Sequence, residues 1–103
     1  MKRPLLWSED ALRELDKTIA YIAARNPSAA RKVLEEIRKT ANGLGVRPTG
    51  RPGRVADTYE KTVTRRPYII AYALDALPDG DERVIILHVI HTARDWPEGQ
   101  WPA

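Results

Sequence analysis

The chain has 103 residues, of which 43% are hydrophobic and 30% charged, and a formal net charge of +3, a balance typical of one small folded domain. It contains no cysteine, which excludes disulfides, thiol catalysis and cysteine-ligated metal sites. The first residues are too weakly apolar for a signal peptide, and the most apolar stretch, 68–77, is shorter than a membrane helix requires. We therefore expect a single domain over residues 1–103, located in the cytoplasm and not in a membrane.

Two amphipathic helices follow a short strand in the N-terminal half. Ser8 and Asn26 stand where each helix would begin, because their side chains can accept a hydrogen bond from the first turn. Asn42-Gly43 is a helix stop signal. The expected elements are an edge strand over 2–7 and helices over 9–25 and from Pro27 to that stop. Apolar residues recur every three or four positions, as on one helical face, at Leu12, Leu15, Ile19 and Ile22, and at Ala30, Val33, Leu34, Ile37, Ala41 and Leu44.

The C-terminal half is typical of strands. Glycine and proline make 45–54 a loop, after which β-branched and aromatic residues become frequent. The expected strands cover 55–64, 68–74 and 83–91, with a turn at Arg65-Arg66-Pro67. The order β-α-α-β-β-β predicts an α+β fold in which a helical hairpin packs on one face of a small, mostly antiparallel sheet.

Positive charge is concentrated in the middle of the chain. Between Arg47 and Arg66 there are six cations and two anions, whereas the other residues carry 11 cations and 12 anions. A localised basic patch favours a polyanion or an acidic protein as partner. The alternative is a solvated arginine-rich loop, and charge alone does not decide between the two.

The sequence offers few residues for nucleophilic or metal chemistry. His88 and His91 lie three positions apart on one expected strand, so their side chains point to opposite faces and cannot chelate one metal. We expect His88 in the core, and His91 at the strand end, where a functional and a structural role are both open. Ser8 and Ser28 both stand at helix starts, which argues against a serine nucleophile. We expect neither a metal nor a cofactor.

A candidate surface combines cations, a histidine and an aromatic ring at the ends of the expected strands. Such residues suit backbone phosphates, stacked bases or a protein target. The structural alternative is that Arg94 pairs with Asp95 or Glu98 and that Trp96 covers the edge of the core. The candidate residues are Arg65, Arg66, His91, Arg94 and Trp96.

Short motifs occur in a fixed order along nearly the whole chain. They are Ser8-Glu9-Asp10-Ala11, Leu15, Ile19-Ala20-Tyr21-Ile22, Pro27-Ser28-Ala29-Ala30, Gly50-Arg51, Tyr68-Ile69-Ile70-Ala71-Tyr72, the run 84–91, and Arg94-Asp95-Trp96-Pro97 after His91. In this order they resemble the RelE/ParE superfamily of toxins from type II toxin–antitoxin modules. The resemblance implies a small cytoplasmic protein with the strand and helix order given above. It also implies a partner, a cognate antitoxin that wraps around the toxin and neutralises it.

The superfamily has two main branches. RelE-like members cut messenger RNA on the ribosome with basic residues on the central strands, whereas ParE-like members lack that set and poison DNA gyrase or act on other targets. At the matching positions this chain has Glu60, Thr62, Ile69 and Thr92. The resemblance therefore favours a ParE-like toxin that acts on gyrase or another non-RNA target and leans against an enzyme. The alternatives are a ribosome-dependent mRNA endonuclease that uses His91, Arg65 and Arg94, and a non-toxic nucleic-acid-binding module.

Overall fold

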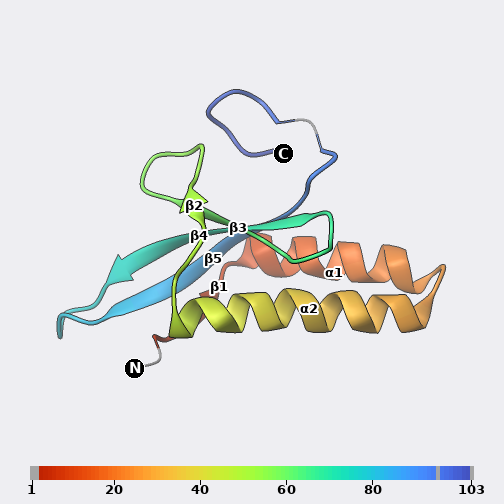
Figure 1. Ribbon diagram of the computed structural model, residues 1–103, viewed down its shortest axis with the longest axis horizontal. Coiled ribbons are helices and arrows are strands. Elements are labelled where there is room, and N and C mark those ends of the chain that lie inside the picture. The colour runs from red at the N-terminus through yellow and green to blue at the C-terminus, as the bar shows by residue number, and fades with distance from the viewer. Residues whose placement is uncertain (1–2, 95, 103) are drawn as a thin grey trace.

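Within residues 3–94 and 96–102, which the computed structural model describes, five strands form one sheet in the order β1-β5-β4-β3-β2. Two helices cover one face of this sheet (Figure 1). Neighbouring strands are antiparallel except β1 and β5, which are parallel. The elements are β1 (Leu5–Trp7), α1 (Glu9–Ala23), α2 (Pro27–Val46), β2 (Arg51–Pro52), β3 (Tyr59–Thr62), β4 (Tyr68–Ala76) and β5 (Glu82–His91). The predicted α+β class and the edge position of the first strand are confirmed; Lys2, where that strand was expected to begin, lies outside the described residues.

Both helices begin where the sequence predicted. The Ser8 hydroxyl accepts a hydrogen bond from the Ala11 amide at 3.0 Å, and the Asn26 side-chain oxygen accepts one from the Ala29 amide at 3.1 Å. These bonds satisfy amide groups that have no carbonyl partner within the first turn of a helix. Neither described helix is both long and apolar enough to span a membrane.

The second helix ends later than the sequence predicted. Asn42-Gly43 does not stop α2, which continues to Val46. Leu44 is 1% exposed, and burying such a side chain contributes about 2 kcal/mol, more than the roughly 1 kcal/mol that a helical glycine costs. The helix ends where Pro48 favours an extended conformation for Arg47, whose φ is −146°.

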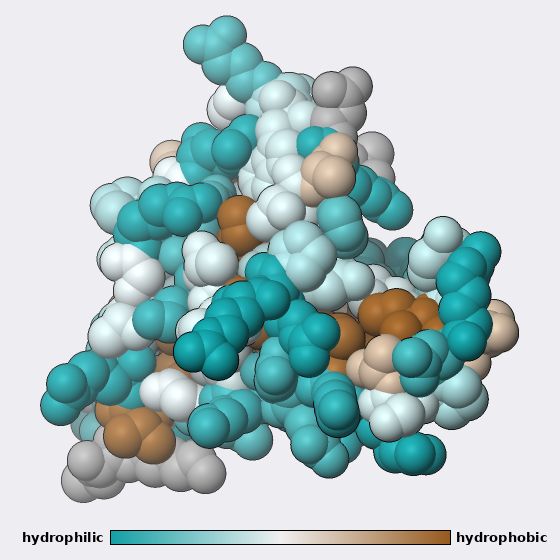
Figure 2. Space-filling model, turned by 45° about the vertical axis from the view of Figure 1, so that its right-hand side comes forward, coloured by the Kyte–Doolittle hydropathy of each residue, from teal (hydrophilic) through white to brown (hydrophobic). Residues whose placement is uncertain are grey.

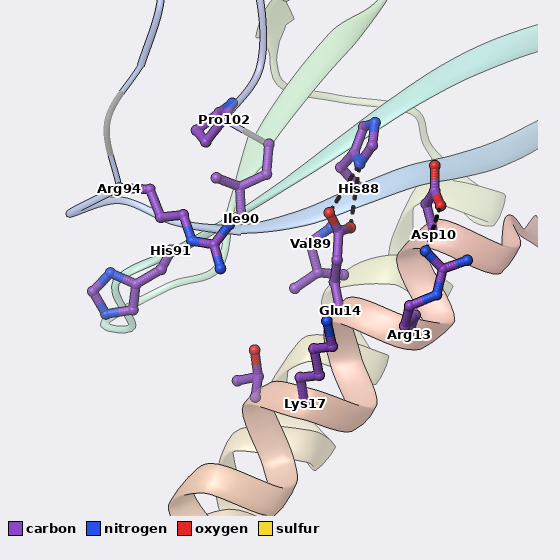
Figure 3. Close-up of a pocket in the computed structure, with 11 residues that line it drawn as sticks. Asp10, Arg13, Glu14, Lys17, His88, Val89, Ile90, His91, Arg94 and Pro102 are labelled. Carbon is purple, nitrogen blue, oxygen red and sulfur yellow. Dashed lines mark hydrogen bonds and ion pairs between the residues drawn. The ribbon is translucent and has the colours of Figure 1, made fainter.

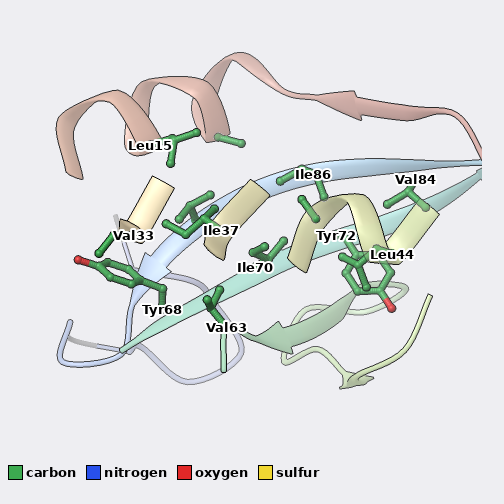
Figure 4. Packing of buried hydrophobic residues seen from close by; sticks show 13 residues of the cluster. Leu15, Val33, Ile37, Leu44, Val63, Tyr68, Ile70, Tyr72, Val84 and Ile86 are labelled. Atoms are coloured by element: carbon green, nitrogen blue, oxygen red, sulfur yellow. The ribbon is translucent and has the colours of Figure 1, made fainter. Parts of the chain in front are cut away.

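The core lies between the helices and the sheet (Figure 4) and is mainly aliphatic. One expected member is wrong: Leu12 is 46% exposed, and the small Ala11 faces the sheet instead. The Ser8 hydroxyl donates a hydrogen bond to the Leu87 carbonyl at 2.9 Å, which holds the first turn of α1 close against β5. The buried cluster consists of Ala11, Leu15, Val33, Ile37, Ala41, Leu44, Val63, Tyr68, Ile70, Tyr72, Val84, Ile86 and Val89.

Strand β3 is shorter than the expected strand over 55–64. Residues 53–58 form a loop instead, closed by a 2.8 Å hydrogen bond from the Gly53 amide to the Thr58 carbonyl. Asp57 has a φ of 62°, which a strand does not allow. The segment expected as a loop before it contains the two-residue strand β2, which pairs with the start of β3.

The other face of the sheet lies under the C-terminal tail after β5, on the side away from the helices (Figure 1). Ile69, Ala71 and Ile90 are buried but do not belong to the helix-side cluster. Because Ile69 pairs with Ile90 and Ala71 with His88, these side chains share that second face. The sheet therefore has two covered faces, one under helices and one under a tail.

Candidate functional site

The two chain segments that carry most of the candidate residues meet at one end of the sheet. Tyr68 pairs with His91, and the Thr92 amide donates a hydrogen bond to the Pro67 carbonyl at 2.8 Å. The β3–β4 turn therefore lies beside the chain that leaves β5, as the sequence predicted. We call Arg65, His91 and Arg94 the strand-end surface.

The two arginines of the turn have different surroundings. Arg65 is exposed and has a φ of 64°, in the left-handed region. Arg66 instead reaches α2, where its Nε donates to the Glu36 carboxylate at 2.5 Å. This hydrogen bond lowers the pKa of Glu36 and raises the pKa of Arg66. Arg66 thus ties the turn to the helix, and Arg65 is left as the outward cation.

His91 has one ring nitrogen already engaged. Its ring stands edge-on to Tyr68 with 5.2 Å between centroids, and its Nδ1 accepts a hydrogen bond from the Ala93 amide at 3.0 Å. A nitrogen that accepts a hydrogen bond carries no proton, so Nε2 is the proton-bearing nitrogen of the neutral ring. The neutral ring therefore offers another molecule an N–H donor at Nε2 and not an acceptor.

His88 is not the core histidine that we expected from the sequence. Its side chain is 23% exposed, and its Nδ1 lies 3.1 Å from the Glu14 carboxylate. The other oxygen of Glu14 accepts the Val89 amide at 3.0 Å. The physical reason is that β1 pairs with β5 only at residues 84–86, so the edge of β5 beyond them takes a side chain from α1 as its partner.

A pocket of about 390 Å³ lies between α1 and the end of β5 (Figure 3). Lys17 extends into it from the helix, and Arg94 extends into it from the chain after β5. His88 and His91 point away from each other, as expected from their spacing, so they cannot act on one reacting atom from two sides. Three cations among the described residues line this pocket and can attract an anionic group, which the carboxylates of Asp10 and Glu14 in the same lining oppose.

Trp96 packs against a residue that the sequence analysis did not connect with it. Its ring centroid is 3.9 Å from the Arg54 guanidinium, and its indole nitrogen donates to the Thr92 carbonyl at 3.4 Å. Trp96 thus joins the C-terminal tail to the 53–58 loop, rather than covering the helix-side core. The alternative pairing of Arg94 with Asp95 lies outside the described residues.

Glu60 is the most buried charged residue of the described chain, with 2% exposure. One carboxylate oxygen accepts a bond from the Arg51 guanidinium at 3.1 Å. The other accepts the Arg54 amide at 3.1 Å and the Trp101 indole at 3.4 Å. One strand carboxylate therefore holds β2, the 53–58 loop and the tail together.

Sequence reasoning missed Glu14 and Glu60. A signal existed for Glu60, a lone carboxylate between Tyr59 and Val63 in a stretch of strand-forming residues. No such signal marks Glu14, which stands on a helix beside the apolar stripe like any solvated glutamate. Among the described residues no group of three or more acidic or histidine side chains is arranged to hold a metal ion.

Comparison with known protein families shows which family this chain belongs to. The family model described as "ParE toxin of type II toxin-antitoxin system, parDE" matches residues 5–96. The chain belongs to the ParE toxin family. The match runs from β1 to Trp96, so it includes the strand-end surface, Glu14 and Glu60.

Two relatives agree with ParE membership. "Putative toxin Y4kP" of Sinorhizobium fredii (strain NGR234) is 36% identical over 98 residues, which cover 94% of this chain and 96% of that protein. A solved structure, "Chromosomal ParDE TA system from P. aeruginosa", superposes with a TM-score of 0.77 at 20% identity, covering 87% of this chain and 96% of that one. The first supports the toxin class, and the second shows the shared fold.

Proposed function

We propose that this ParE-family chain inhibits growth in the cytoplasm by acting on DNA gyrase or another non-RNA target, and that a cognate antitoxin silences it. The observation that carries the proposal is Glu60. Where mRNA-cleaving members of the superfamily have a lysine, this chain has a buried carboxylate fully engaged by hydrogen bonds. Cleavage of a phosphodiester needs cations beside the developing negative charge, so a carboxylate at that position opposes it.

The strand-end surface is the proposed contact with the target. Arg65 and Arg94 are exposed cations, and neither belongs to the buried core. Exposed arginines contribute little to stability, so a role of these two side chains in recognition does not conflict with the fold. A binding role also accounts for His91, whose ring lies beside Tyr68 and presents one donor nitrogen.

Induced expression in cells separates the candidate functions. For the proposed function we expect altered plasmid supercoiling, while primer extension on abundant transcripts shows no new ends. Arg65→Ala should relieve growth inhibition without unfolding the chain. Arg31→Ala, which removes an exposed arginine from α2, is the matched control and should stay toxic.

His91→Ala distinguishes a binder from an endonuclease. General acid–base catalysis by histidine contributes about 10²–10⁴-fold, so a nuclease would lose most of its activity. A binder should lose only a modest part of its affinity. If new mRNA cleavage sites appear within translated frames and His91→Ala abolishes them, the chain is an mRNA endonuclease and the proposed function is wrong. If the wild-type chain does not affect growth, the chain is instead a non-toxic nucleic-acid-binding module.

A further inference from the structure

A second groove, of about 580 Å³, lies between the C-terminal half of α2 and the outer edge of β3. Its lining is different from that of the strand-end pocket. The floor is apolar, formed by Leu44 of α2 and Val63 after β3, both of which are buried. Threonines and cations form the walls.

The charge of this groove is strongly positive. Four cations line it: Lys39 of α2, Arg47 directly after this helix, and Lys61 and Arg65 from the sheet side. The one carboxylate among the described lining residues is Glu36, which Arg66 already holds in an ion pair. With four cations against one carboxylate that Arg66 also holds, the lining keeps a net positive charge, which favours an acidic occupant.

The strand that borders the groove has an open edge. The described strand β2 pairs with β3 only at Tyr59 and Glu60. The Val63 amide donates to the Tyr68 carbonyl at 2.9 Å, so by the alternation of an antiparallel ladder the backbone groups of Thr62 point away from β4, toward the groove side. An unpaired strand edge is a template for one more strand.

The dimensions suit a short extended peptide. The helix wall from Glu36 to Arg47 is about 16 Å long at 1.5 Å per residue, and about five extended residues span that length. The Lys61 ammonium donates to the Thr49 hydroxyl at 2.9 Å, which places a charge across one end of the groove.

We propose that this groove binds an extended acidic segment of a partner protein. The segment pairs with the open edge of β3, places its carboxylates against Lys39, Lys61 and Arg65, and sets an apolar side chain on the floor. The identity of the partner as the antitoxin rests on the function proposed above. On the face of the molecule shown in Figure 2, hydrophilic side chains surround a few hydrophobic patches.

A nucleic acid fits this groove less well than a peptide. Its phosphates would satisfy the cations, but its backbone has no regularly spaced donor for the Thr62 carbonyl and no partner for the strand ladder. A peptide supplies both the donors and the acceptors of β-strand addition.

The first test needs no knowledge of the partner. The full chain, labelled with ¹⁵N, is titrated with the peptide Glu-Val-Asp-Val-Glu, with Lys-Val-Lys-Val-Lys, and with a five-nucleotide thymidine strand. We expect only the acidic peptide to shift the amide signals of Lys39, Thr62 and Thr64. The inference fails if these signals do not move with the acidic peptide, or if the oligonucleotide moves them equally.

The second test uses the partner encoded beside this chain, purified in complex with it. We expect Lys39→Glu and Thr62→Pro each to weaken the complex by at least about tenfold, because one places like charges together and the other removes a strand donor. Lys32→Glu, the same charge reversal on the exposed side of α2, should leave the affinity unchanged. The inference is wrong if Lys39→Glu and Thr62→Pro bind this partner as tightly as Lys32→Glu does. If the wild-type chain does not bind this partner but does bind the acidic peptide, only the identity of the partner is wrong.

Discussion

The two faces of the sheet are held by different kinds of interaction. The helix side is closed by aliphatic side chains such as Ile37, Ile70 and Ile86, which are completely buried. The tail side is closed around two polar centres, the Glu60 carboxylate and the His88–Glu14 pair, with Trp101 in contact with both Glu60 and His88.

This difference separates what fixes the fold from what arranges the surface. Apolar packing is non-directional and proportional to buried area, so it determines that helices cover the sheet. Hydrogen bonds to a carboxylate are directional and fix the positions of individual loops. We therefore expect substitutions on the helix side to unfold the chain, and substitutions on the tail side to rearrange β2, the 53–58 loop and the tail.

The strongest test of the difference between the two faces is a substitution that creates a cavity on the helix side. Ile70→Ala removes a buried side chain from the central strand β4, and we expect a loss of about 2–5 kcal/mol in the free energy of unfolding. Urea denaturation followed by circular dichroism measures this loss. Leu12→Ala, on the exposed part of α1, should change stability by about 0.5 kcal/mol or less. Equal losses for the two variants would contradict the assigned core.

The next test removes the polar centre of the tail side. Glu60→Gln keeps the shape of the side chain but weakens its charge-assisted bonds to Arg51, the Arg54 amide and Trp101, and we expect a loss of about 1–3 kcal/mol. The indole signal of Trp101 should shift in the NMR spectrum while the helix-side signals stay in place. Glu35→Gln, exposed on α2, is the control. An unmoved Trp101 signal would show that the tail is held by other contacts.

The helix side was largely predictable from the sequence, and the tail side was not. The four-and-three spacing of Ile37, Ala41 and Leu44 marks one helical face. Ser8 and Asn26 mark helix starts. Both signals are readable because each lies within a few residues of chain. The error at Leu12 arose because the contact of Ser8 with β5, which turns the helix, is not local.

The tail-side centres depend on partners far apart in sequence. Glu14 lies 74 residues from His88, and Glu60 lies 41 residues from Trp101. A periodic pattern carries no information about such pairs, because each glutamate looks locally like a solvated charge. The same limit applies to the pairing of Arg66 with Glu36, 30 residues away, which no local pattern predicts.

A smaller effect is expected at the one polar bond of a core tyrosine. The Tyr72 hydroxyl donates to the Thr49 carbonyl at 2.6 Å, and Tyr72→Phe should cost about 1 kcal/mol by leaving that acceptor without its donor. Burial also raises the pKa of Tyr72 and of Tyr68. Because the folded state favours the neutral phenols, their contribution to stability is complete below the unfolded pKa of about 10 and is lost as the pH rises through the raised folded values.

Absorbance at the tyrosinate band during an alkaline titration checks this expectation. The wild-type chain should show two tyrosines that ionise later than free tyrosine, and Tyr72→Phe should remove one of them. If the late ionisations persist unchanged in Tyr72→Phe, burial of this hydroxyl is not their cause. The titration therefore shows whether the one polar group of Tyr72 is buried on the otherwise apolar helix side of the sheet.

The smallest effect is expected at the ion pair between Arg66 and Glu36, which joins the β3–β4 turn to α2 at the rim of the helix side. Both side chains are partly exposed to water, so Arg66→Gln should lower stability only slightly at neutral pH, and less in high salt. The hydrogen bond from Arg66 holds the pKa of Glu36 below its ordinary value of 4.5. The stabilisation is therefore present above that ordinary value and is lost as the pH falls through the lowered folded pKa. Urea midpoints of wild type and Arg66→Gln should thus converge in acid, while Arg31→Gln, an exposed α2 control, should match the wild type throughout. If Arg66→Gln loses as much stability relative to wild type as Glu60→Gln does, polar interactions hold both faces of the sheet to the same extent. The distinction between the two faces would then be wrong.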